Sequence, residues 1–144
     1  MAIAQMNWGR LKYSPIDHRL ADFNSALSIV YKLAEAHKGF IWRVPDADAA
    51  AELLALGHDE RMSATVSVWR SIDDLHDFTF AGLHGDFLRR KNEWFEAVEE
   101  PQLAIWNVDH LERPSFRQAF ERLEHLKQNG DGAFVQGWPD HLRQ

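Results

Sequence analysis

Residues 62–69 read MSATVSVW, a strict alternation of two kinds of side chain. Successive side chains along a β-strand point to opposite faces of a sheet, so this period of two predicts a strand with one buried face. One side carries Met62, Ala64, Val66 and Val68, and the other carries Ser63, Thr65, Ser67 and Trp69. The second face therefore combines hydroxyl groups with an indole.

Segments on either side of this strand follow a regular order. Alternating, aromatic or branched runs predict further strands over residues 2–8, 39–44 and 103–108. Apolar residues at helical spacing, preceded by capping residues, predict helices over residues 17–38, 46–57, 71–98 and 115–129. We expect Gly82 and Gly85 to divide the third helix, since each costs about 1 kcal/mol relative to Ala in a helix interior.

The order β, α, β, β, α, β, with an extra helix in the middle and another at the end, predicts an α+β fold. In the ferredoxin-like plan, a four-stranded antiparallel sheet carries its helices on one face. If Ala4, Met6 and Val66 meet those helices, the face with Thr65 and Trp69 is open. That face is too apolar to be left wet and too polar for a dry core. We therefore expect two copies to pair there, as a homodimer, around a ligand cavity.

The composition limits the domain organisation and the partners. We predict one domain over residues 1–144, with a core over 1–110 and a C-terminal helix and tail over 114–144. No run approaches the roughly 20 apolar residues of a membrane span, and a net charge of -6 disfavours nucleic acid as a partner. There is no Cys, which removes disulfides and thiolate nucleophiles. Without a signal-peptide pattern at the N-terminus, we expect a cytoplasmic protein.

Several aromatic blocks between residues 2 and 108 carry a family resemblance. These blocks are AQMNWGRL, GFIWRV, SVWRSIDDLHDF, LHGDFLRRKNEWF and LAIWNV. They resemble the family called domain of unknown function 3291, which is similar to antibiotic-biosynthesis monooxygenases and other dimeric α+β barrel proteins. That wider group includes cofactor-free oxygenases of aromatic polyketides, haem-degrading enzymes and isomerases. Asn7 matches a first-strand Asn of the haem-degrading members, but Phe78 stands where their catalytic Trp falls, which disfavours haem degradation.

His84 is the main candidate for chemistry. With Phe80 and Leu88 it lies on one helical stripe at four-residue spacing, so it can sit beside apolar residues and face a cavity. Phe80 on this stripe is a candidate for substrate binding. Burial lowers the pKa of an imidazole, which can then exchange a proton with a phenol or an activated methylene near neutral pH. The alternative is a core histidine bonded to a backbone carbonyl. His76 has the same two interpretations, as a site residue or as a solvated ion-pairing group.

Three polar side chains of the strands are candidates for orienting a substrate oxygen. Asn7, Thr65 and Ser67 can donate hydrogen bonds to a carbonyl or enolate. They can equally bond to one another across neighbouring strands.

Tryptophans and arginines are the remaining candidates for binding. Trp42, Trp69 and Trp106 suit the walls of an aromatic site, or the core. Arg43 and Arg89 suit an anionic group of the ligand. Because side chains alternate along a strand, either Trp42 or Arg43 faces the cavity, and the sequence leaves both choices open.

The sequence lacks the common signatures of metal, nucleophilic and nucleotide sites. It contains no HExxH, GxSxG, GxGxxG or Walker pattern. We therefore expect no metal and no cofactor. The leading hypothesis is a small enzyme, a monooxygenase, cyclase or isomerase, acting on an aromatic or polyketide-like molecule, with His84 as acid or base and Asn7 orienting an oxygen. The alternatives are a haem-binding or haem-degrading protein and a non-catalytic dimer that binds a small hydrophobic ligand.

Overall fold

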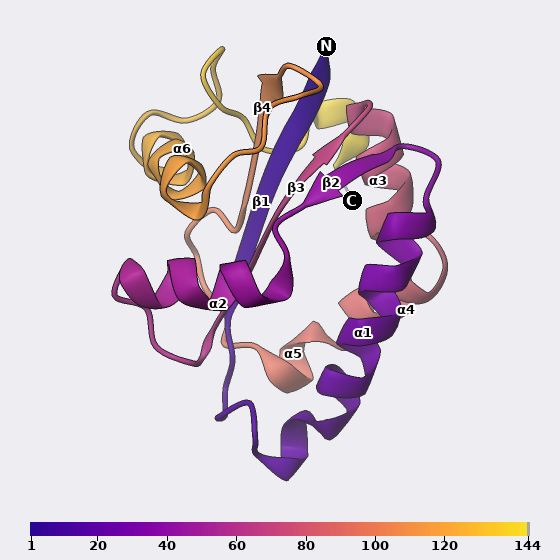
Figure 1. Cartoon of the computed structure of the whole chain (residues 1–144), viewed down its shortest axis with the longest axis vertical. Helices are drawn as coiled ribbons and strands as arrows, with labels where there is room; N and C mark the ends of the chain where they lie inside the picture. Colours follow the sequence, from indigo (N-terminus) through magenta and orange to yellow (C-terminus); the bar gives the residue numbers. More distant parts are fainter. Residues whose placement is uncertain (144) are drawn as a thin grey trace.

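Four strands form one antiparallel sheet in the order β2-β3-β1-β4 (Figure 1). Their bounds are β1 Ala2–Arg10, β2 Phe40–Arg43, β3 Met62–Trp69 and β4 Leu103–Val108. The computed structural model describes residues 1–143, apart from the side chain of Leu83. The predictions for β3 and β4 are confirmed at both ends, because in both strands clear breaks in the apolar pattern coincide with the ends of pairing.

The helices follow the predicted order with shorter segments. Their bounds are α1 Ala21–Ala36, α2 Asp46–Ala55, α3 Ile72–Phe80, α4 Gly82–Arg89, α5 Lys91–Trp94 and α6 Phe116–Asn129. Two short 3-10 turns, η1 His18–Leu20 and η2 Asp140–Leu142, complete the chain. Asp17 caps η1 and not α1, since its carboxylate accepts the backbone N–H of Arg19. Ser71 and Ser115 cap α3 and α6 as predicted.

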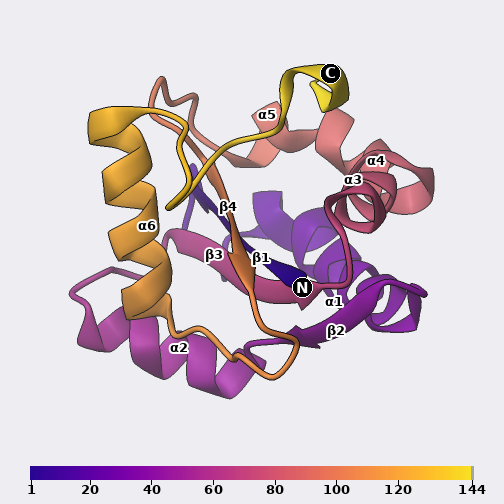
Figure 2. The ribbon, with the colours of Figure 1, turned by 90° about the horizontal axis from the view of Figure 1, so that it is seen from above.

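Helices of the same chain cover both faces of the sheet (Figure 2). On one face α6, with α2, packs against fully buried side chains such as Ala4, Met6 and Val66. On the other face, Ala34 of α1 and Leu75 of α3 pack with Trp69. The expectation of an open face is therefore wrong for the described residues.

The faces are also exchanged relative to the prediction. The helices between the strands were expected to meet Ala4, Met6 and Val66, but α1 and α3 lie over the face that carries Trp69. The amphipathic α6 supplies the apolar side chains that bury the opposite face. Burial of the sheet needs no second copy, and the homodimer stays a prediction.

The tail after α6 docks on the sheet edge and on α3. Gln136 exchanges two backbone hydrogen bonds with Ile105 of β4, at 2.7 and 2.8 Å. Trp138 then packs against the rings of His76 and Phe80. The tail therefore covers the β4 edge and adds an indole beside α3.

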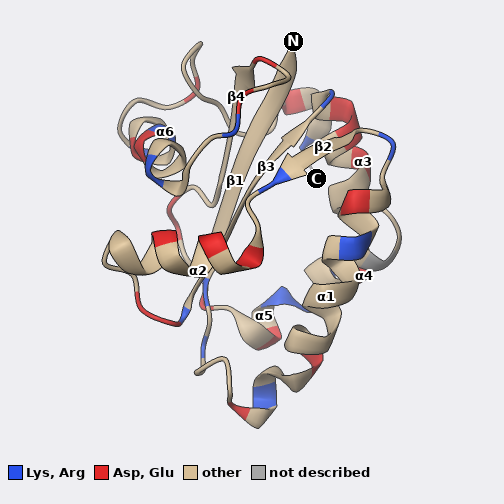
Figure 3. Cartoon of the chain, viewed as in Figure 1, with Lys and Arg blue, Asp and Glu red and all other residues tan. Residues whose placement is uncertain are grey.

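Charged side chains gather on the helices and loops (Figure 3). Within the strands the charged residues are Arg10 and Arg43, each the last residue of its strand. The space between the sheet and its helices is thus largely uncharged. In the described part of the chain, no helix combines the length and the apolar character that crossing a membrane requires.

Candidate functional site

A cavity of about 510 Å³ lies between the Trp69 face of the sheet and α1, α3, α4 and α5. It brings together most of the residues that the sequence marked for a site. These are Asn7, Arg43, Thr65, Ser67, Trp69, Phe80 and His84. One chain lines this cavity, because its helices cover the face that was expected to await a partner.

The other three candidates lie elsewhere. Trp42 and Trp106 belong to the cluster on the opposite face, with the α6 side chains. Arg89 is 70% exposed and pairs with Asp86 on its own helix. Because Trp42 packs on the α6 side, Arg43 is the member of that pair that faces the cavity.

His84 is half-buried, and one of its two ring nitrogens is committed to the backbone. Its Nδ1 lies 2.6 Å from the carbonyl oxygen of Thr79. A carbonyl only accepts, so Nδ1 carries the proton and Nε2 of the neutral ring is an acceptor. Among the described residues no group bonds to Nε2, and the atom is not sealed from solvent. Burial lowers the pKa of His84, and the bond to Thr79 opposes part of that effect.

A break between α3 and α4 creates this arrangement. Ala81 leaves the helical conformation, with ψ at 158°, and Gly82 has a positive φ of 57°. The last carbonyls of α3 therefore lie beyond the regular helical ladder, and that of Thr79 is free to accept from His84. Gly85 permits the close approach of the two helices, since a Cβ there would lie 2.4 Å from the carbonyl oxygen of Phe80.

Polar side chains form a hydrogen-bonded row along β1 and β3. Gln5, which is 4% exposed, donates to Ser67 Oγ at 2.8 Å and to Thr65 Oγ1 at 3.3 Å. Thr65 in turn donates to Asn7 Oδ1 at 3.0 Å. Asn7 stands at the exposed end of the row. These side chains therefore use some of their donors and acceptors to bond to one another across strands, as the alternative proposed.

Ser67, at the buried end of the row, has a hydroxyl proton that is free to donate a hydrogen bond. Its oxygen accepts from both Gln5 and Trp69 Nε1, each at 2.8 Å. Both lone pairs are engaged, so the hydroxyl proton is left to donate, and no described residue accepts it. A hydroxyl that accepts two hydrogen bonds is polarised into a better donor.

Stacked aromatic rings link Ser67 to His84. Trp69 stacks on Phe78, with ring centroids 5.1 Å apart, and Phe78 lies 4.7 Å from the His84 ring. The imidazole is thus at the Ser67 end of the polar row. Asn7 is at the far end, so Ser67 is better placed than Asn7 to share a substrate with His84.

Sequence reasoning left several lining residues out of the site. Gln5 could have been included, because its place in the β1 alternation puts it beside Ser67. Phe23 and Trp138 also line the cavity, and they come from segments whose placement depends on tertiary packing. Phe23 packs on Trp94 with centroids 5.5 Å apart, which closes one end of the space.

His76 contacts the C-terminal tail. His76 Nε2 lies 2.8 Å from the carbonyl of Leu142, and its ring packs with Phe80 and Trp138. His76 therefore holds the tail against α3. Among residues 1–143, no three side chains of the metal-binding types gather around a common point.

Comparison with known proteins places the chain in a family and a fold. No curated protein matches it. The structure of NE2512, a protein of unknown function from Nitrosomonas europaea, is similar with a TM-score of 0.53 at 10% identity, over 79% of this chain and 95% of that one. The structure of a protein called YJCS is similar with a TM-score of 0.50 at 16% identity, over 76% and 100%. These likenesses show the fold alone. The family model described as Domain of unknown function (DUF3291) matches residues 2–143, and the chain belongs to that family.

Proposed function

We propose that the cavity binds a neutral aromatic or polyketide-like molecule and that His84 moves a proton on it. One observation supports this most directly: His84 has Nδ1 tied to the Thr79 carbonyl and lines the same cavity as the Ser67 hydroxyl, which still has a proton to donate. His84 supplies an acceptor, Ser67 supplies a donor, and aromatic rings line the cavity between them. This combination suits a flat molecule that carries an oxygen.

The proposed step is proton abstraction next to a carbonyl. Nε2 of His84 takes a proton from the carbon beside the carbonyl, and the electron pair of that C–H bond forms an enolate. The Ser67 hydroxyl donates to the enolate oxygen and stabilises its charge. In a conjugated enolate, return of the proton from Nε2 to another carbon gives an isomer. Attack of the enolate carbon on a second carbonyl of the same molecule closes a ring, and the alkoxide formed there takes the proton from Nε2. Neither outcome consumes an oxidant or a reductant.

The lowered pKa suits this role. A pKa below the ordinary value of 6.5 keeps the imidazole neutral, and so able to accept a proton, at neutral pH. The largely uncharged surroundings favour a neutral substrate over an anion. Of the two predicted cations, Arg43 lines the cavity, and it is already bonded to Glu35 and Asp46.

We further propose that the chain is a ferredoxin-like relative of antibiotic-biosynthesis monooxygenases that acts in the cytoplasm. The order of elements and the sheet order β2-β3-β1-β4 support the fold relationship. Oxygenation of the same enolate would use dioxygen as the oxidant, and dependence of turnover on air distinguishes that variant. A homodimer would join through surfaces other than the two covered sheet faces.

Binding of 2-naphthol, a bicyclic phenol, tests the proposal. Trp69, Trp94 and Trp138 line the cavity, so their fluorescence reports binding. Loss of one hydrogen bond acceptor in His84→Ala is expected to weaken binding between about twofold and tenfold. His18→Ala is the control, because the His18 side chain is 91% exposed. Absence of binding to the wild-type chain would contradict the proposal.

A non-catalytic binding protein is the second candidate. It is favoured by the polar row, in which Gln5, Thr65 and Asn7 already bond to one another. Equal 2-naphthol affinity in wild type and His84→Ala, with no turnover of any ketone, would favour it. A Soret band on titration with haem would instead favour the haem-binding alternative.

A further inference from the structure

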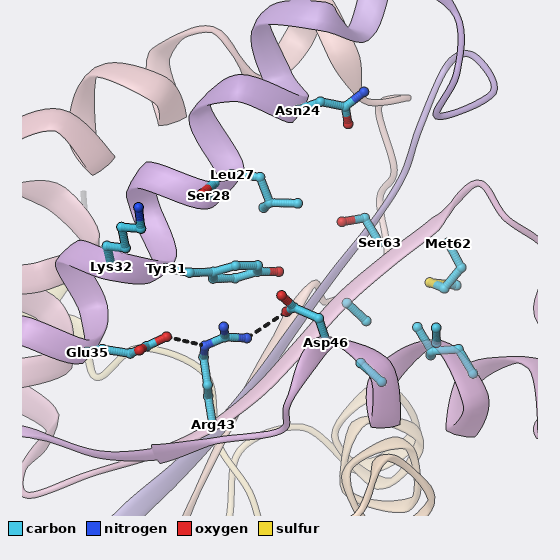
Figure 4. A pocket seen from close by; sticks show the side chains of 14 residues that line it. Asn24, Leu27, Ser28, Tyr31, Lys32, Glu35, Arg43, Asp46, Met62 and Ser63 are labelled. Carbon is cyan, nitrogen blue, oxygen red and sulfur yellow. Dashed lines mark hydrogen bonds and ion pairs between the residues drawn. The ribbon is translucent and has the colours of Figure 1, made fainter.

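A second, outer cavity of about 690 Å³ lies between α1 and α2 (Figure 4). It adjoins the inner cavity, because Leu27, Tyr31, Arg43 and Ser63 line both. Its floor is apolar, with Ala49, Ala50, Leu53 and Met62 among its lining residues. The small side chains of the alanine-rich α2 leave this space open.

Tyr31 and Arg43 stand between the two cavities. The Arg43 guanidinium lies over the Tyr31 ring, 4.1 Å from its centroid. Arg43 Nε donates to Glu35 on α1 at 3.0 Å, and Nη1 donates to Asp46 at the start of α2 at 2.7 Å (Figure 4). Glu35 and Asp46 are exposed, so the two ion pairs that hold the guanidinium in place are in contact with solvent. We call Tyr31 and Arg43 the partition, and its guanidinium is held by carboxylates at the surface.

Charge in the outer cavity is balanced. Its lining includes two cations, Arg43 and Lys32, and two carboxylates, Glu35 and Asp46, so neither an anionic nor a cationic group gains a net attraction. An uncharged chain can lie on the floor of α2 and β3 without displacing an ion pair.

We infer that an elongated, uncharged ligand lies in the cavity beside His84 with its tail directed toward the outer cavity, and that Tyr31 and Arg43, which line both cavities, determine how long a tail is accepted. This rests on the proposed function, with the aromatic end of the ligand beside His84 and an apolar tail directed toward α2. Tyr31 and Arg43 are then specificity-determining residues.

A series of 4-n-alkylphenols, from methyl to decyl, tests the inference. Each buried methylene is expected to tighten binding about fourfold. In the wild-type chain the gain stops when the tail reaches the partition. In Tyr31→Ala and in Arg43→Ala the gain continues to longer tails, whereas Tyr31→Phe keeps the wild-type limit because the ring remains.

Two further variants separate the partition from general loosening. Like Arg43, Arg90 lies over an aromatic ring, that of Trp94, and bonds to two carboxylates, but it lines neither cavity. Arg90→Ala should therefore keep the wild-type limit. Adding Ala50→Phe to Arg43→Ala fills the outer cavity from the exposed side of α2 and should restore the limit.

The outcomes separate this inference from the function on which it rests. If 4-methylphenol binds and the length limit is the same in wild type, Tyr31→Ala and Arg43→Ala, with all three folded by circular dichroism, the partition has no such role. If 4-methylphenol does not bind the wild-type chain, the proposed function fails and this inference fails with it.

Discussion

His84 differs from an ordinary surface histidine in two ways that act together. The ring lies against Phe78 and has lost much of its contact with water, which disfavours the charged form and lowers its pKa. Its Nδ1 proton is fixed by the Thr79 carbonyl, so the neutral ring presents Nε2 as its acceptor. A solvated histidine would have neither a fixed tautomer nor a preference for the neutral form.

The lowered pKa of His84 predicts a pH dependence of stability. The unfolded chain binds a proton at the ordinary pKa of 6.5, and the folded chain only at a lower pH. Stability is therefore fully present above 6.5 and falls as the pH drops through 6.5 toward the folded pKa. Urea unfolding at about pH 8 and pH 5 measures how much of the free energy of unfolding is lost on acidification. This loss should be smaller in His84→Gln than in wild type. His18→Gln should keep the wild-type loss, and an unchanged loss in His84→Gln would contradict the lowered pKa.

Gln5 is the residue on which the polar row depends. Replacement of Gln5 by Ala removes the donor to Thr65 Oγ1 and one of the two donors to Ser67 Oγ, and a buried polar group deprived of a partner costs about 1–3 kcal/mol. We expect a loss of that size in the free energy of unfolding. Gln128→Ala, on the exposed face of α6, should change it by less than about 0.5 kcal/mol. A similar, small change in both variants would show that the row contributes little.

At the scale of elements, the break between α3 and α4 matters most for the site. Gly82 and Gly85 predict a break, and the structure confirms it beside Gly82. The break also lets a carbonyl of α3 accept a hydrogen bond from His84. The sequence could not predict this contact, because it depends on the angle between the two helices. Strand patterns were more informative, since a period of two fixes which side chains share a face whatever covers that face.

Gly85→Ala tests whether the break positions His84. The new Cβ would lie 2.4 Å from the Phe80 carbonyl oxygen, so the two helices must separate. Overpacking of this kind costs about 1–3 kcal/mol. We also expect the pKa of His84 to move back toward its ordinary value and 2-naphthol to bind more weakly, as followed by NMR titration of the ring. Gly132→Ala, with open space around its Cβ, is the control. An unchanged His84 pKa in Gly85→Ala would contradict the positioning role.

At the scale of the whole molecule, the C-terminal helix decides which face of the sheet carries the site. The alternation in β1 and β3 correctly separated Ala4 and Val66 from Thr65 and Trp69. It could not tell which set meets α1 and α3, because both sets contain enough apolar area to be covered. The answer depends on α6, which buries the Val66 face within the chain. The mixed face is thereby left to form the cavity.

Ala119→Arg tests this role of α6. Ala119 is fully buried within the cluster that α6 forms with the sheet, and an unpaired charge there is expected to cost about 3 kcal/mol or more. The apolar face then becomes exposed, so the variant should self-associate in sedimentation velocity experiments. Glu121→Arg places the same side chain on the exposed face of α6 and should not. If Ala119→Arg is as stable as wild type and sediments as wild type does, α6 does not protect this face.

The central claim is that His84 takes a proton from carbon inside the cavity, and hydrogen–deuterium exchange measures this directly. The probe is 2-tetralone, a bicyclic aromatic ketone with an activated methylene, followed by NMR in deuterated buffer near pH 7. The wild-type chain and His18→Ala should exchange that methylene faster than buffer alone, and His84→Ala should return the rate to that of buffer. Exchange no faster than buffer with the wild-type chain, or equal exchange with His84→Ala, would contradict the account.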